Sequence, residues 1–191
     1  VKRERRIRTV HEMEILEITE GNVLFRAVCE SGTYIRTLCV DMGDALAVGG
    51  HMLELRRTRT ATFTEDKAVK LQELKDAFVE YQEKGDEKPL RSIILPFERM
   101  LDHMPKIYVK DSAVDAVCHG ADLAVPGINK VEGTFGKGEI VAVLTQKGEG
   151  IAMGEAKMPS DKILGAKKGN AVNLQRVFME PGTYPKLWKK R

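Results

Sequence analysis

The chain has 191 residues, of which 42% are hydrophobic and 31% charged, the composition of one large or two small soluble domains. No apolar run approaches the roughly 18 residues of a membrane span, and no signal-peptide pattern is seen at the start, so we expect no membrane association. Cys29, Cys39 and Cys118 lack metal-ligand spacing and stand among apolar residues. They predict small core thiols in a reducing, cytoplasmic compartment, with no metal site.

The net charge of +3 is unevenly distributed along the chain. Basic side chains concentrate in residues 1–10, in the run Leu55–Arg59 and in residues 185–191, whereas residues 72–88 lean acidic. Basic blocks separated by an acidic one suggest that part of the surface binds a polyanion. Charge alone equally allows solvated faces without a ligand.

The first third of the chain predicts a hairpin, a helix and a further strand. Residues 12–29 alternate polar and apolar side chains on both sides of a glycine-containing turn, which favours two antiparallel strands. Thr33 is a suitable N-cap for a helix whose apolar residues recur every three or four positions, with Gly49 and Gly50 as its stop. Residues 51–59 alternate again and predict a strand.

The middle of the chain predicts one longer helix and a domain boundary. The helix is expected over residues 70–84. A short strand or turn at Pro96 follows, and then a helical piece that is closed by Pro105. We place the boundary here, so that the first domain is 1–104 and the second is 105–191.

After Pro105 the chain changes to short strands with frequent glycines. A strand is expected at 106–110 and a helix at 111–120, with Asp111 or Ser112 as its cap. Strand-like stretches then follow at 122–128, 139–145, 150–156 and 171–178. This outline predicts a small β-barrel-like domain, and the fold class of the whole chain is therefore α+β.

Arg36 has an unusual position in the predicted helix. With Thr33 as N-cap, Arg36 stands in the first turn, where a cation costs about 0.3–1 kcal/mol because the helix dipole prefers acidic residues. A guanidinium beside free backbone N–H groups forms a strong site for a phosphate or a carboxylate. The alternative is a surface arginine folded over its neighbours.

The run Leu55–Arg59 combines an apolar side chain with three arginines. On a strand, the arginines could point toward phosphates while the leucine faces a base. An edge strand protected by its charges is the alternative.

Asp41 and Asp44 follow Arg36 on the helix, but nothing in the sequence places them in a pocket with a base. Nucleotide-binding, zinc-protease and nucleophile-elbow motifs are absent.

Several blocks of this sequence resemble one known family. Residues 30–69, which include ESGTYIRTL and HMLELRRTR, closely resemble the third motif region of TruB-type pseudouridine synthases. The version with HMLELRRTR is most similar to the archaeal dyskerin homologues, the catalytic subunits of box H/ACA guide ribonucleoproteins. Residues 105–128 resemble the start of their PUA domain, and residues 177–191 resemble their C-terminal end, so the resemblance covers essentially the whole chain.

The resemblance implies an isomerase that converts uridine to pseudouridine in RNA. In this family the target base is flipped into a pocket, and an aspartate acts as the nucleophile when the glycosidic bond breaks. No metal, redox or nucleotide cofactor is implied. The aspartate belongs to a G-x-L-D-P motif that is absent from these 191 residues. We therefore expect the chain to be the C-terminal part of a longer enzyme and to be inactive alone.

The resemblance also assigns roles to individual residues. Arg36 matches the arginine that pairs with the catalytic aspartate, Tyr34 matches the tyrosine of the same motif, and Leu55 matches the leucine that packs against the target base. The candidate RNA-binding residues form two sets, one in the basic run and one in the PUA region that lies near the ACA-reading surface. These residues are Arg56, Arg57 and Arg59, and His119, Gly120, Ala121, Asp122, Leu123, Pro126 and Gly127.

The implied partners are a guide RNA, a substrate rRNA or tRNA, and the upstream part of the same enzyme. The family also implies a zinc-ribbon-like or peptide-like small subunit and a β-barrel subunit. Two alternatives stay open. The chain could be a non-catalytic RNA-binding protein with a PUA domain, or part of a stand-alone tRNA pseudouridine synthase.

Overall fold

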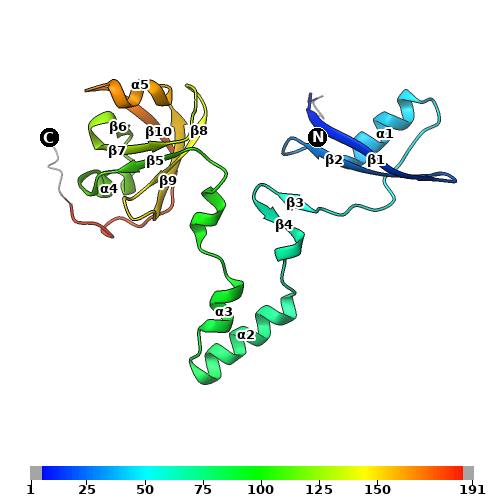
Figure 1. The fold of residues 1–191 in the computed structure, drawn as a ribbon, viewed down its shortest axis with the longest axis horizontal. Helices are drawn as coiled ribbons and strands as arrows, with labels where there is room; N and C mark the ends of the chain where they lie inside the picture. Colours follow the sequence, from blue (N-terminus) through cyan, green and yellow to red (C-terminus); the bar gives the residue numbers. More distant parts are fainter. Residues whose placement is uncertain (1–5, 187–191) are drawn as a thin grey trace, which may run out of the picture. The chain divides into compact units, whose positions relative to one another are not determined.

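The computed structural model describes residues 6–186 (Figure 1). The chain forms two compact units, of which the first ends at Arg57 and the second begins at Thr58. The basic residues predicted to contribute to a polyanion surface at 1–5 and 187–191 lie outside the described residues. The fold is mixed α+β, as the sequence predicted. The domain boundary after residue 104 stays a prediction.

The first unit consists of a long hairpin and one helix. Its elements are β1 (Val10–Thr19), β2 (Asn22–Cys29) and α1 (Ile35–Ala45). The two strands pair antiparallel across a tight turn in which Gly21 has φ +75°. The predicted hairpin is therefore confirmed.

The hairpin has one apolar face and one charged face. Ile15 stands directly opposite Phe25 on the apolar face, whereas Glu14 and Arg26 form a 3.2 Å ion pair on the other. Ile15 is exposed, and among the described residues of this unit only Gly43 is buried. The first unit therefore has no hydrophobic core of its own.

Helix α1 is confirmed, but its predicted cap is wrong. Tyr34 occupies the N-cap position, and no side chain caps the helix. The Thr33 hydroxyl instead donates a 2.8 Å hydrogen bond to the carbonyl oxygen of Glu30, in the turn before the helix. Arg36 is thus the second helical residue, in a first turn that contains no acidic side chain.

The helix ends at Ala45, ahead of the glycines predicted to stop it, and these glycines bring the following loop against the helix. A Cβ built on Gly43 would stand 2.2 Å from the carbonyl carbon of Gly49. A Cβ on Gly50 would stand 2.6 Å from the carbonyl oxygen of Cys39. Glycine at both positions lets the two backbones lie in direct contact.

The strand predicted over residues 51–59 is wrong for all but its last residue. Residues 51–58 have no regular secondary structure, and Arg59–Thr60 forms the short strand β3, which pairs with β4 (Phe63–Thr64). Period-two alternation cannot distinguish a paired strand from an extended loop. Among the described residues, this stretch has no neighbouring strand with which to pair.

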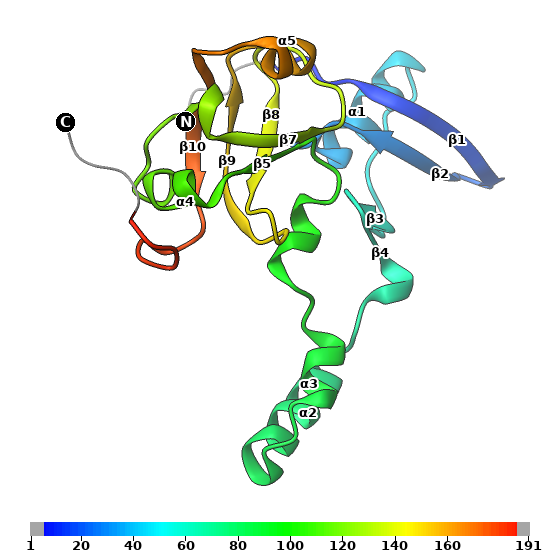
Figure 2. The same cartoon turned by 60° about the vertical axis from the view of Figure 1, so that its left-hand side comes forward.

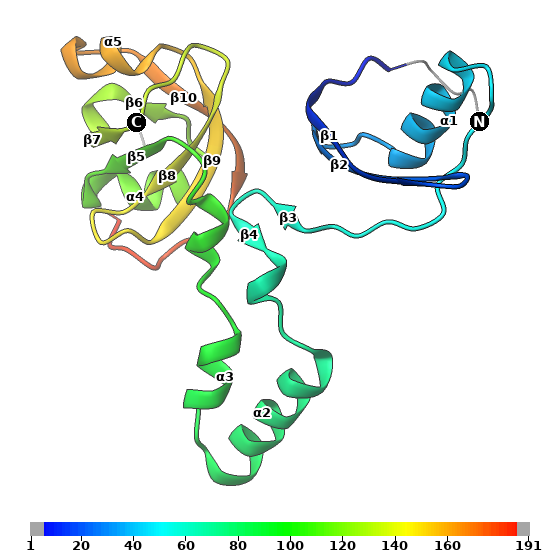
Figure 3. The same cartoon turned by 45° about the vertical axis from the view of Figure 1, so that its right-hand side comes forward.

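The second unit begins with the β3–β4 hairpin and a series of helical segments. These are η1 (Glu65–Lys67), α2 (Leu71–Lys84), α3 (Lys88–Ile93) and η2 (Phe97–Leu101). Helices α2 and α3 lie side by side (Figure 3), and Gly85, with φ +70°, ends α2 as a left-handed C-cap. The predicted 70–84 helix is confirmed, and of the strand or turn predicted at Pro96 the strand does not form.

The C-terminal region is a six-stranded sheet that curls into a half-barrel (Figure 2). The strand order is β6-β10-β9-β8-β5-β7, and every neighbouring pair is antiparallel except β5 and β8. The elements are β5 (Lys106–Val109), α4 (Asp111–Cys118), β6 (Leu123–Ala124), η3 (Val125–Gly127), β7 (Ile128–Glu132), β8 (Ile140–Leu144), β9 (Gly150–Ala156), α5 (Ser160–Gly165) and β10 (Asn170–Val177). The predicted β-barrel-like domain is confirmed.

Sequence reasoning missed some details of this domain. Strand β7 and helix α5 were not predicted, and residues 122–128 form a two-residue strand and a 3-10 turn because Pro126 interrupts the pairing. Neither Asp111 nor Ser112 caps α4, whose N-cap is Lys110. Helix α4 packs against β9 and β10, whereas α5 lies beside β7.

Residues 97–104 pack on this sheet, although they precede the predicted boundary. The ring of Phe97 lies 4.7 Å from that of Phe178, and Leu101 is buried against Leu144. The Glu98 carboxylate accepts a 3.0 Å hydrogen bond from the N–H of Gly150. Segment η2 is thus structurally part of the C-terminal sheet domain.

A carboxylate at the β8–β9 turn holds the C-terminal segment. The Tyr184 hydroxyl and the Thr145 hydroxyl both donate hydrogen bonds to Glu149, at 2.5 and 2.9 Å. These bonds, first that from Tyr184, hold the pKa of the Glu149 carboxyl below its ordinary value. The Lys147 ammonium lies 5.4 Å from the centre of the Tyr184 ring.

Acidification is expected to release Tyr184 from Glu149. Because the carboxyl has a lower pKa in the folded chain than in the unfolded one, its contribution to stability is present at neutral pH. This contribution is lost as the pH falls through the ordinary range of a glutamate toward the lower folded value. An NMR titration of the Tyr184 ring protons in the full chain measures the release. Glu149→Ala, which removes the acceptor, should reproduce the released state at pH 7, whereas a pH-independent Tyr184 signal in the unsubstituted chain would contradict the expectation.

Within residues 6–186, no helix combines the length and apolar character needed to cross a membrane. In the same range, no group of three His, Cys, Asp or Glu residues could hold a metal ion. Cys29, Cys39 and Cys118 are free thiols, and burial raises the pKa of the Cys118 thiol.

Candidate active site and RNA-binding surface

A hollow of about 320 Å³ opens at the N-terminal end of α1 in the first unit. Two stretches of chain line it. One is residues 32–36, and the other consists of Met52, Leu55 and Arg57. The structure thus brings together Tyr34, Arg36 and Leu55, the three residues that the resemblance assigns to a catalytic pocket.

The loop after α1 explains how Leu55 reaches the start of the helix. The chain leaves α1 at its C-terminal end and crosses back over the helix where Gly43 contacts Gly49 and Gly50. Residues 51–57 then return to the first turn of the helix, where Leu55 and Arg57 line the hollow. The backbone contact at Gly43 is therefore the local feature that sets the second wall of the hollow.

The lining of the hollow combines cationic and apolar side chains. Arg36 and Arg57 contribute two guanidinium groups, and none of the lining residues is acidic. Within residues 6–186, no ion pair or side-chain hydrogen bond engages the Arg36 guanidinium. Tyr34 and Leu55 are 68% and 52% exposed. Such a site can bind an anionic group together with a flat ring.

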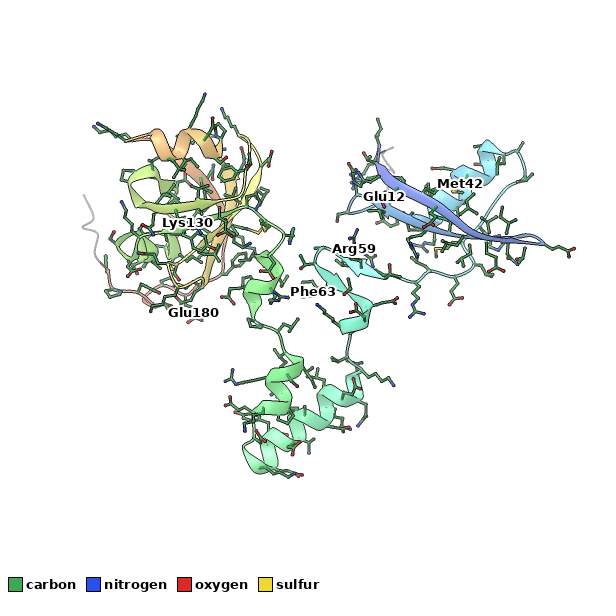
Figure 4. The ribbon with its side chains drawn as sticks, viewed as in Figure 1. Glu12, Met42, Arg59, Phe63, Lys130 and Glu180 are labelled. Carbon is green, nitrogen blue, oxygen red and sulfur yellow. The ribbon has the colours of Figure 1, made fainter. Side chains whose placement is uncertain are left out.

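Other candidate residues lie outside this hollow. Arg56 makes interactions of its own and is not among the lining residues. Arg59 lies on the β3–β4 hairpin of the second unit, as does Phe63 (Figure 4). Asp41 and Asp44 are exposed on α1 and do not line the hollow. Of the three arginines in the basic run, Arg57 lines the hollow, and Arg56 and Arg59 do not.

In the C-terminal domain, two of the predicted RNA-binding residues have structural contacts. The Asp122 carboxylate accepts hydrogen bonds from the Asn170 side-chain amide at 3.0 Å and from the Leu174 N–H at 3.1 Å. His119 Nδ1 lies 2.7 Å from the carbonyl oxygen of Asp115. Leu123 is buried in the core. The exposed members of the predicted set are His119, Gly120, Ala121, Asp122 and Pro126.

A second hollow, of about 250 Å³, lies in this domain beside Pro126. Lys110 and Lys167 stand at its rim with Asn129, and apolar side chains from η3, β7 and α5 line the rest. The Lys110 ammonium donates a 2.8 Å hydrogen bond to the Pro126 carbonyl oxygen. Sequence reasoning missed these three polar residues. The lysine pair in GAKKGN was the only signal for Lys167, whereas nothing distinguished Lys110 or Asn129 from ordinary surface residues.

Comparison with known protein families gives two matches. The tRNA pseudouridylate synthase B C-terminal domain matches residues 36–102, and the PUA domain matches residues 105–178. These two domains define the class of protein, a pseudouridine synthase C-terminal domain followed by a PUA domain.

Individual relatives give the same result. The chain is 54% identical to a Methanocaldococcus jannaschii protein named "Probable tRNA pseudouridine synthase B", over 100% of this chain and 57% of the relative. An Archaeoglobus fulgidus protein of the same name is 53% identical over 99% of this chain and 58% of the relative. The chain carries the C-terminal TruB and PUA domains of the archaeal TruB/Cbf5 pseudouridine synthases. It spans little more than half the length of these curated relatives.

Solved structures of the family have the same fold. An archaeal box H/ACA Nop10–Cbf5 complex superposes with a TM-score of 0.89 at 48% identity, over 95% of this chain and 59% of that chain. An H/ACA ribonucleoprotein bound to a substrate RNA that contains 2'-deoxyuridine gives a TM-score of 0.86 at 48% identity, over 96% of this chain and 58% of that chain. A Cbf5–Nop10–Gar1 complex is similar as well, with a TM-score of 0.88.

Proposed function

We propose that this chain is the C-terminal part of an RNA-guided pseudouridine synthase and supplies one wall of its active site. The observation that carries the proposal is the hollow in which Tyr34, Arg36 and Leu55 meet. Arg36 would form a charge-assisted pair with the nucleophilic aspartate of the upstream part, and Leu55 would pack against the target base. In the reaction, the N-glycosidic bond of uridine breaks and the same sugar carbon is rejoined to a ring carbon, so no cofactor is consumed.

The exposed apolar face of the hairpin supports the part of the proposal that concerns an upstream segment. Met13, Ile15, Ile18 and Val23 are all exposed. A two-stranded hairpin is at best marginally stable in water unless another element covers its apolar face. The relatives contain a further 40% or so of chain beyond the part matched here, since 57% is covered. We propose that this upstream part covers the hairpin and completes the catalytic domain.

The C-terminal domain would bind the guide RNA. The loop at His119–Ala121 and the hollow beside Pro126 lie on exposed surface of the PUA domain. Lys110 and Lys167 at the rim could contact phosphates, and the apolar lining could accommodate a base. In this proposal the guide RNA selects the substrate by base pairing, and small protein subunits like those in the related complexes would assemble with the complete enzyme.

The test uses a completed enzyme, in which the upstream part of the Methanocaldococcus jannaschii relative is fused before Val1 of this chain. Pseudouridine formation is assayed with a guide RNA and its substrate, with free tRNA alone, and with the 191-residue chain in place of the fusion. We expect product only from the fusion with guide RNA. An inactive fusion that still binds RNA would favour a non-catalytic RNA-binding protein. Activity on free tRNA without a guide would identify a stand-alone tRNA enzyme.

Replacing Gly43 by alanine is expected to destabilise the completed enzyme by about 1–3 kcal/mol. The added Cβ would stand within 2.4 Å of three backbone atoms of Gly49 and Gly50, so the loop must move away from α1. This displacement also moves Leu55, and we expect activity to fall. Chemical denaturation measures the stability. The matched control is Asp41→Ala, a change on the exposed face of the same helix, and equal effects of the two substitutions would contradict the argument.

A further inference from the structure

Glu30 forms hydrogen bonds with two segments, with Thr9 just before β1 and with Thr33 in the turn that leads into the hollow. Its N–H donates to the Thr9 carbonyl oxygen at 3.0 Å, and its carboxylate accepts from the Thr9 N–H at 3.2 Å. Its own carbonyl oxygen accepts from the Thr33 N–H at 3.2 Å and from the Thr33 hydroxyl at 2.8 Å. Glu30 therefore joins the start of β1 to the turn that precedes α1.

The Glu30 carboxylate ties this turn to another segment by a side-chain hydrogen bond, whereas the Thr33 hydroxyl bonds within the turn itself. Helix α1 lacks a side-chain cap, and its first turn contains no acidic residue that could bond to the free N–H groups. Gly32, within the turn, has φ +79°, a left-handed conformation that glycine adopts without steric strain. Tyr34 and Arg36 follow directly and line the hollow. The position of both side chains thus depends on how the turn is held.

The charges around Glu30 favour its ionised form. The N–H of Thr9 is the main cause that holds the pKa of the Glu30 carboxyl below its ordinary value, and the neighbouring Arg8 and His11 side chains act in the same direction. The Arg8 guanidinium also lies against the turn, since a Cβ built on Gly32 would stand 3.4 Å from Arg8 Nη2. At neutral pH the turn is consequently tied to β1 by a carboxylate.

We propose that Glu30 is a positioning residue, which holds the turn at residues 30–33 so that Tyr34 and Arg36 face the catalytic hollow. This inference rests on the proposed function. Glu30 does not line the hollow, so it acts on the reaction only through the backbone of the turn. A displacement of about 1 Å in a catalytic group can lower a rate by up to about 100-fold, so a modest movement of the turn suffices.

The test compares Glu30→Ala and Glu30→Gln in the completed enzyme. The alanine variant removes the acceptor for the Thr9 N–H, whereas glutamine keeps an acceptor oxygen without the charge. We expect Glu30→Ala to lower the single-turnover rate constant at saturating RNA about 10-fold, with the substrate Kd within about twofold of the unsubstituted value. Glu30→Gln should recover most of the rate. The matched control is Glu14→Ala, which removes an exposed carboxylate of the adjacent hairpin and should leave the rate unchanged.

Two results would overturn the inference. One is an unchanged rate in Glu30→Ala. The other is a loss caused by unfolding, in which the melting temperature of Glu30→Ala falls and glutamine does not restore the rate. Hydrogen exchange at the Thr33 and Leu38 amides, which donate to the carbonyl oxygens of Glu30 and Tyr34, provides a readout that does not depend on activity, and we expect faster exchange in Glu30→Ala. If the unsubstituted fusion is inactive, the proposed function fails, and unchanged exchange at these amides would then reject the positioning role separately.

Discussion

Replacing Arg36 by alanine in the completed enzyme is expected to lower the single-turnover rate by at least about 100-fold and to leave guide-RNA affinity within about twofold. Arg36 is one of two guanidinium groups in a hollow whose lining contains no acidic side chain. A charge that has no partner in the described part of the chain is suited to an anion that another segment brings. Loss of that pair would leave the nucleophilic carboxylate without its orienting group, while RNA contacts elsewhere persist.

Two further variants test whether the effect depends on the guanidinium geometry and on the position of Arg36. Arg36→Lys keeps the positive charge but loses the planar fork of donors, so it should recover only part of the rate. Arg26→Ala is the matched control, because Arg26 belongs to an exposed ion pair with Glu14 on the hairpin and does not line the hollow. Normal turnover in Arg36→Ala would reject the role of Arg36, and an equal loss in Arg26→Ala would show that any arginine in this unit has the same effect.

The sequence predicted those parts of the fold that depend on local patterns. The hairpin and α2 followed from alternation, helical spacing and glycine stops, and the curled sheet followed from short strands between glycines. The cap of α1 could not be predicted, because Thr33 bonds to the carbonyl oxygen of Glu30, a local alternative that competes with capping. The path of residues 51–58 could not be predicted either, since it is set by a backbone contact between Gly43 and two glycines farther along the chain.

The candidate site, like the fold, could be predicted from local patterns only in part. Arg36 was identified as an anion-binding candidate from its place in a helical turn, and Leu55 as an apolar side chain that could face a base, whereas Tyr34 received a role only through resemblance to the family. Local reasoning gave no sign that Leu55 lies near Arg36, because the loop that joins them has no regular structure. It also gave no sign of Glu30, whose contacts with Thr9 and Thr33 exist only once the hairpin and the turn have formed.

The substitution Lys167→Ala tests the RNA-binding surface proposed for the C-terminal domain. Lys167 stands at the rim of the hollow beside Pro126, and its ammonium could neutralise one phosphate. Removal of one such contact should weaken binding similarly for all guide sequences and reduce the slope of log K against log salt by about 0.7–0.9. Lys137→Ala, which changes another exposed lysine between β7 and β8, is the matched control. An unchanged slope in Lys167→Ala would exclude a phosphate contact at this position.

Removing the whole C-terminal domain from the completed enzyme is expected to weaken guide-RNA binding by at least about tenfold and to abolish discrimination of the ACA element. The structure determines where the cut should be made. A chain that ends at Pro105 would keep Phe97 and Leu101 without the sheet against which they pack, so it would expose an apolar surface and tend to aggregate. A chain that ends at Leu95 removes this segment together with the sheet. Filter binding with intact and ACA-mutated guides measures both quantities, and retention of full affinity and ACA discrimination by the Leu95 truncation would reject RNA binding by this domain.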